Sequence, residues 1–111
     1  MEKFYMMLGY ALTGLVLMGI SIPMIQRKVR PNPWYGLRTP KTLSSPNIWY
    51  PANEYCGVML MLAGGVMAVA SLVLLFVPFL SRDSYAFAQL AVVMISLIFA
   101  VVKSFQYVKK L

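Results

Sequence analysis

Polar, aromatic and proline residues gather in residues 31–57, between long stretches that are almost wholly apolar. Arg38 has the strongest capacity for recognition there, because a guanidinium beside a membrane can hold a phosphate or a carboxylate through two hydrogen bonds. Thr39, Thr42 and Ser45 supply hydroxyl groups close to it in the sequence. We therefore predict a recognition surface for a lipid headgroup or for the anionic end of a peptide.

A structural role for the same segment is the alternative. Arg38 would then cap the carbonyl groups at the end of the preceding helix or pair with Glu54, and so fix the loop in place. The aromatic residues of the segment suit the headgroup region of a membrane under either interpretation; they are Trp34, Tyr35, Trp49 and Tyr50. The sequence leaves both roles open.

Catalytic and metal-binding chemistry has few candidates in this chain. There is no histidine and one cysteine, Cys56, so neither a His/Cys metal site nor an intrachain disulfide can form. The three acidic residues, Glu2, Glu54 and Asp83, are expected on both sides of a membrane, which excludes a carboxylate pair. We expect no enzymatic activity and no cofactor, and we interpret the nine methionines as apolar packing rather than copper ligands.

The elements that position residues 31–57 are apolar enough to be membrane helices. The chain has 111 residues, of which 60% are hydrophobic and 12% are charged, and its mean hydropathy is +0.73. Apolar runs at residues 4–25, 57–80 and 85–102 are each long enough to cross a hydrocarbon core of ~30 Å. The first run is too long for the apolar part of a cleaved signal peptide. We predict an all-α integral membrane protein with three transmembrane helices in a single domain, residues 1–111.

Between the first and second spans we predict a structured loop and an interfacial helix. Three prolines exclude a regular helix over residues 31–40, and Gly36 favours a turn. Ser45 followed by Pro46 is typical of a helix start, with the serine as N-cap. This helix is expected to begin at the membrane interface and to run on into the second span.

One face of the second span carries mostly small residues. At about 100° per residue, Asn53, Gly64, Ala68, Ser71 and Leu75 all fall within about 40° of Gly57. Small residues let transmembrane backbones approach closely. We therefore predict helix packing through Gly57, Gly64, Ala68 and Ser71.

The third span has a polar face of its own. Measured from Gln89, this face contains Ser96, Ala100, Lys103 and Tyr107. A single glutamine in a span is more often an interhelical hydrogen-bond partner than a functional group. We expect this face to look toward the other helices, and residues 81–84 to form a tight polar connection before it.

The distribution of lysine and arginine predicts the orientation. Ten Lys and Arg against three acidic residues give a net charge of +7, which we interpret as membrane flanks and not as a nucleic-acid surface. The N-terminus and second loop hold two of the cations, whereas the first loop and the C-terminal tail hold eight. The positive-inside rule then places the N-terminus outside, the C-terminus inside and residues 31–57 in the cytoplasm.

Residues 31–57 resemble the signature of the SdpI family of small bacterial membrane proteins. The matching positions are Asn32, Tyr35, Gly36, Leu37, Arg38, Thr39, Pro40, Thr42, Leu43, Ser45, Trp49, Asn53 and Gly57. The resemblance implies an all-helical, multi-pass protein of the bacterial cytoplasmic membrane. The named member of the family is an immunity protein against a secreted peptide toxin, and it signals by holding a repressor at the membrane. This chain is a shorter form with one three-helix unit, and it has Glu54 where matching relatives often carry arginine.

Two functions of different classes follow. In the first, the chain is a non-enzymatic binding protein with an immunity or signalling role against a membrane-active peptide toxin, which it contacts through the motif residues. In the second, it is a small structural accessory subunit packed on a larger membrane complex. The expected partners are the lipid bilayer, with lipid headgroups, a peptide toxin or a larger complex in addition. We also expect that the chain can self-associate, because three spans bury little of their own surface.

Overall fold

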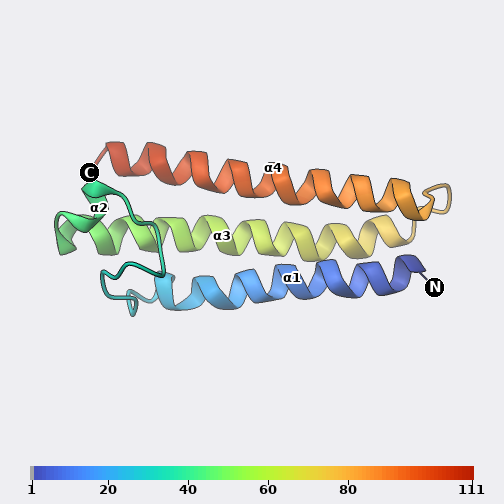
Figure 1. Cartoon of the computed structure of the whole chain (residues 1–111), viewed down its shortest axis with the longest axis horizontal. Helices are drawn as coiled ribbons and strands as arrows, with labels where there is room; N and C mark the ends of the chain where they lie inside the picture. Colours follow the sequence, from blue (N-terminus) through green and yellow to red (C-terminus); the bar gives the residue numbers. More distant parts are fainter. Residues whose placement is uncertain (1) are drawn as a thin grey trace.

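The computed structural model describes residues 2–111, and this part of the chain is all-helical (Figure 1). The helices are α1 (Glu2–Ile25), α2 (Pro40–Leu43), α3 (Pro46–Leu75) and α4 (Arg82–Lys109). The three long helices each contain a stretch hydrophobic enough to cross a membrane, with mean hydropathies of 1.8, 2.5 and 2.4. The prediction of an all-α protein with three transmembrane helices is confirmed.

Helix α3 is the centre of the assembly. Helix α1 packs along one side of α3 and helix α4 along another, whereas α1 and α4 touch each other little (Figure 1). The three long helices lie side by side and alternate in direction (Figure 1). The molecule is therefore elongated, with a length of 51 Å and a cross-section of 22 by 19 Å. At ~1.5 Å per residue, α3 is about 45 Å long. It therefore exceeds a ~30 Å hydrocarbon core by several turns.

Small residues bring α1 and α3 together, on the face of α3 predicted from the sequence. A Cβ atom added at Gly64 would lie 2.5 Å from the carbonyl oxygen of Gly14, and one added at Gly14 would lie 3.3 Å from Cβ of Ala68. Further along, Gly57 faces the carbonyl oxygen of Ser21. The helix backbones can approach this closely because no side chain stands between them.

Polar side chains of α4 bond to the backbone of α3. The Tyr85 hydroxyl donates to the carbonyl oxygen of Ser71 at 2.8 Å, and Gln89 Nε2 donates to that of Met67 at 3.0 Å. Both donors are fully buried. Gln89 thus makes the interhelical hydrogen bond expected of it. Further along α4, Lys103 is half-buried, with its ammonium 5.6 Å from the Phe99 ring centroid.

The ends of α3 and α4 differ from the predicted spans. Helix α3 ends at Leu75, before residue 80, because Pro78 has no N–H and its ring disfavours a continuing helix. The predicted connection at residues 81–84 is wrong, since Ser81 is the N-cap of α4 and accepts a hydrogen bond from Ser84 N–H at 3.1 Å. The connection is residues 76–81. Helix α4 also continues beyond residue 102 to Lys109.

Candidate functional site

At the end of the molecule that carries the C-terminus, residues 26–45 fold over the first turns of α3 (Figure 1). We call this segment and residues 46–54 of α3 the cap. Its centre is Trp49, whose side chain is fully buried. The indole Nε1 donates a hydrogen bond to the carbonyl oxygen of Val29 at 2.8 Å. This bond joins the start of the loop to α3, so the cap is a packed structure and not a free loop.

Asn53, one turn after Trp49, is the second buried residue that holds the loop. Its Oδ1 accepts a hydrogen bond from Leu37 N–H at 2.6 Å, and its Nδ2 donates to the carbonyl oxygen of Trp49 at 3.0 Å. Gly36 lies directly against this amide, with φ +104°, and an added Cβ would be 2.6 Å from Oδ1 of Asn53. Glycine is required there by both the close approach and the backbone conformation.

Asn32 and Tyr35 form the turn that precedes Gly36. Asn32 Oδ1 accepts hydrogen bonds from Trp34 N–H at 2.8 Å and from Tyr35 N–H at 2.6 Å. A side chain that bonds its own backbone two residues on makes the turn typical of asparagine. The Tyr35 hydroxyl donates to the carbonyl oxygen of Ile20 on α1. Burial raises the pKa of this phenol above its usual 10.0.

Helix α2 is a single short turn fixed by two threonines. Thr39 is its N-cap and accepts a hydrogen bond from Thr42 N–H at 3.1 Å, while Thr42 Oγ1 accepts one from Thr39 N–H at 2.8 Å. The Thr42 hydroxyl is fully buried and donates to the carbonyl oxygen of Leu37 at 2.9 Å. The sequence interpretation missed α2, although Thr39, Pro40 and Thr42 have the spacing of a capping box with proline at the first helical position.

The start of α3 was predicted correctly. Ser45 is the N-cap, with its hydroxyl oxygen accepting a hydrogen bond from Asn47 N–H at 3.2 Å, and Pro46 occupies the first turn. The interfacial helix expected before the second span is the first part of α3 itself. Pro51 lies inside this continuous helix.

Arg38 is the exception among the motif residues. Nine of the other twelve matching residues form the turns, helix starts and buried contacts of the cap, namely Asn32, Tyr35, Gly36, Thr39, Pro40, Thr42, Ser45, Trp49 and Asn53. Arg38 is exposed and makes no hydrogen bond or salt bridge with any residue in 2–111. The expected pairing of Arg38 with Glu54, or with carbonyl groups at the end of α1, is wrong.

The partner of Glu54 is Arg27, which the sequence interpretation counted only among the cations that flank the membrane spans. Arg27 Nε donates to Glu54 Oε2, and both side chains are about half exposed. Arg27 follows the end of α1 with φ 58°, a left-handed conformation that turns the chain back toward α3. Because α1 and α3 are antiparallel neighbours, the residue after α1 reaches the start of α3, whereas Arg38 lies beyond the next turn.

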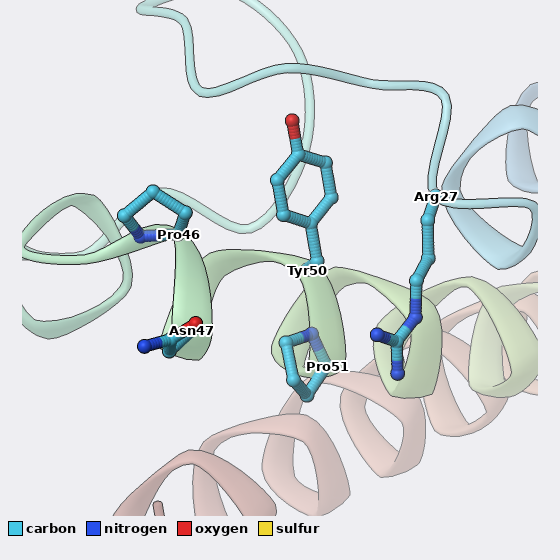
Figure 2. Close-up of a pocket in the computed structure, with 5 residues that line it drawn as sticks. All are labelled: Arg27, Pro46, Asn47, Tyr50 and Pro51. Carbon is cyan, nitrogen blue, oxygen red and sulfur yellow. The ribbon is translucent and has the colours of Figure 1, made fainter.

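A pocket of about 340 Å³ opens beside this arginine (Figure 2). Its lining is Arg27, Pro46, Asn47, Tyr50 and Pro51. In Figure 2, the Arg27 side chain descends from the end of α1 to the level of Pro51, and the Tyr50 ring stands up from α3 toward the loop. The sequence pointed to Tyr50 as a headgroup-region residue but gave no signal that Arg27 would join it.

The charge of the protein is concentrated at the cap end. Eight Lys and Arg side chains against the single carboxylate of Glu54 put the whole net charge of +7 there, while two cations and two carboxylates cancel at the other end. The eight cations are Arg27, Lys28, Arg30, Arg38, Lys41, Lys103, Lys109 and Lys110. Such a surface attracts phosphates and carboxylates. Among residues 2–111, no group of three or more His, Cys, Asp and Glu side chains comes together as a metal site would require.

A comparison with known protein families gave a match. The model of the SdpI/YfhL protein family matches residues 28–104, which include most of the cap, α3 and most of α4. No curated protein and no solved structure matches the chain significantly.

Proposed function

Because this chain belongs to the SdpI/YfhL protein family, we propose that it is a non-enzymatic binding protein with an immunity or signalling role against a membrane-active peptide. Its multi-pass helical structure and the family match agree with a membrane protein of this family. The location that we propose is the bacterial cytoplasmic membrane. The role of the family's named member is the source of the immunity proposal.

The observation that carries this proposal is the contrast between Arg38 and the residues around it. Leu37, directly before Arg38, is bonded to Asn53, and Thr39, directly after it, caps α2. The backbone on both sides of Arg38 is therefore fixed, whereas its side chain is exposed and unpaired among residues 2–111. A held guanidinium with no internal partner is suited to bind a carboxylate, such as the C-terminus or an acidic side chain of a peptide.

The test uses cells of the native strain. Cells that lack the gene would be exposed to cell-free medium from the same strain, with the chain supplied as wild type, as Arg38→Ala or as Lys28→Ala. Lys28 is also exposed and cationic, so it controls for the loss of one charge. We expect the wild type and Lys28→Ala to protect and Arg38→Ala to fail, at equal protein level and equal melting temperature. Full protection by Arg38→Ala would contradict the recognition role.

An accessory subunit remains the second candidate, favoured by a group of exposed aromatic side chains at the end opposite the cap. Phe76, Phe79 and Phe87 are 79%, 86% and 73% exposed. Aromatic groups of this kind suit either the membrane interface or a larger membrane protein. Purification of the tagged chain from native membranes in a mild detergent distinguishes the two functions. A large complex of fixed composition would support the subunit, and a free monomer or small homo-oligomer would exclude it.

A further inference from the structure

One face of α3 is covered by neither α1 nor α4. It carries the pocket at Arg27 near the start of the helix and two apolar grooves further along. At about 100° per residue, Asn47, Pro51, Val58, Gly65 and Val69 fall within about 40° of one line along the helix. The first two residues line the pocket at Arg27, and the last two line a groove in the membrane-spanning part of α3. The pocket and the groove therefore lie on the same side of the molecule.

The two grooves lie on either side of a ridge formed by Leu62 and Val66. Toward α1 the groove is about 630 Å³ and its floor contains Gly65, where an added Cβ would meet nothing within 4 Å. Toward α4 the groove is about 250 Å³ and is lined by Ile95 and Phe99 among others. Leu62 and Val66 line both grooves. Val66 is about 18 Å along the helix from Glu54, a depth that an acyl chain reaches from the headgroup region.

The Arg27–Glu54 ion pair leaves the arginine able to bind an anion. Glu54 occupies only Nε of the guanidinium, and the two terminal nitrogens have no hydrogen-bond partner among residues 2–111. Glu54 thereby orients the guanidinium beside the pocket that Tyr50 and Asn47 also line (Figure 2). Terminal guanidinium nitrogens in this arrangement match the oxygens of a phosphate.

We propose that this face binds one anionic diacyl phospholipid, with its phosphate at Arg27 and its two acyl chains in the grooves on either side of Leu62 and Val66. The shape fits, because a pocket with an arginine in its lining and two apolar grooves lie along the same helix. The charge also fits, because the whole net charge of +7 lies at the pocket end. The site is distinct from the exposed Arg38 that the proposed function uses.

A second copy of the chain is a poorer occupant of the same face. Two copies in one membrane share one orientation, so pairing through this face would bring the two basic ends together. Their charges would repel, and nothing on the face supplies the opposite charge except Glu54, which is already paired. An anionic lipid brings the missing negative charge with it.

The experiment is native mass spectrometry of the full chain, stripped of lipid in detergent and then mixed with palmitoyl-oleoyl phosphatidylglycerol or with the zwitterionic phosphatidylcholine of the same chains. We expect one phosphatidylglycerol molecule to stay bound and phosphatidylcholine to bind at least about tenfold more weakly. Both lipids carry the phosphate, but the choline cation of phosphatidylcholine is repelled by the cationic cap end. Equal retention of the two lipids would overturn the proposal, and so would a dimer mass in place of bound lipid.

Matched variants test the two parts of the site. Gly65→Leu fills the larger groove without a clash, and Gly19→Leu adds the same side chain on α1 where a Cβ also meets nothing within 4 Å. Arg27→Gln removes the phosphate contact, and Lys28→Gln removes one charge beside it. We expect Gly65→Leu and Arg27→Gln each to lower phosphatidylglycerol retention about tenfold, with the two controls unchanged. Retention by Gly65→Leu equal to that of Gly19→Leu would refute the groove assignment, even if Arg27→Gln failed to fold.

Discussion

The N–H group of Leu37 donates a hydrogen bond of 2.6 Å to Oδ1 of Asn53, from the middle of the loop to the buried side of α3. Asn53 is 2% exposed, and its Nδ2 bonds in turn to the backbone of Trp49. One side chain thus joins the helix to the segment that presents Arg38. Loss of this amide would leave the part-buried N–H group of Leu37 without its acceptor, which carries a desolvation cost.

The first prediction concerns the stability of the cap. We expect Asn53→Ala to lower the free energy of unfolding by about 1–3 kcal/mol, because Leu37 N–H then lacks an acceptor. In a Trp34→Phe background, Trp49 is the remaining tryptophan and its emission reports directly on the cap. Denaturant titration of the purified protein in detergent would measure the loss. Asn47→Ala is the control, since Asn47 is exposed, and an equal effect there would contradict the role of Asn53.

A second prediction concerns Gly36. Its φ of +104° disfavours any residue with a Cβ, and that Cβ would lie 2.6 Å from Oδ1 of Asn53. We expect Gly36→Ala to open the cap at a cost of at least about 1–2 kcal/mol. The measurement is limited proteolysis of residues 26–45, with cleavage expected to be faster than in the wild type. Unchanged cleavage of Gly36→Ala would contradict this prediction, because it would show that the loop adjusts without loss of stability. Gly19→Ala is the control, since Gly19 has open space around it on α1, and its cleavage should equal that of the wild type.

Local signals in the sequence predicted much of this structure, and non-local contacts account for part of what was missed. Ser45 and Pro46 are a local helix start, and three long apolar runs suffice to predict three spans. Helix α2 had a local signal that was overlooked, the capping box of Thr39 and Thr42, whereas the partner of Glu54 depends on a contact between α1 and α3. Such contacts are fixed by packing between elements and not by residue type or period.

The same distinction applies to the glycines of α1. They recur every five residues and so predicted no single face. The structure uses only Gly14 against α3, while Gly9 and Gly19 have open space around them. The small-residue face of α3 was visible from sequence because it repeats at helical spacing over several turns. On α1 the facing residues include Gly14, Met18 and Ser21. Because these differ in size, they form no stripe of small residues that the sequence would reveal.

A third prediction follows from that contact between α1 and α3. A Cβ at Gly64 would lie 2.5 Å from the carbonyl oxygen of Gly14, so Gly64→Ala must push the helices apart. We expect it to destabilise the protein even though alanine favours a helix by ~1 kcal/mol over glycine. The neighbouring Gly65→Ala has open space and should be neutral or stabilising. Unfolding in increasing sodium dodecyl sulfate would measure both, and equal midpoints would contradict the close packing.

The last prediction concerns orientation, and it follows from the concentration of the entire net charge at the cap end. The positive-inside rule places that end in the cytoplasm. Cys56 is the only cysteine, so a Cys56→Ser background accepts single probes at exposed serines on either end. In spheroplasts, a membrane-impermeant maleimide should label Ser84→Cys, in the first turn of α4, and should label Ser44→Cys, in the cap, only after lysis. The reverse pattern would place the cap outside the cell. An external cap would meet a secreted peptide before that peptide entered the membrane. A cytoplasmic cap would meet only a peptide that has crossed the bilayer or that acts from within the bilayer.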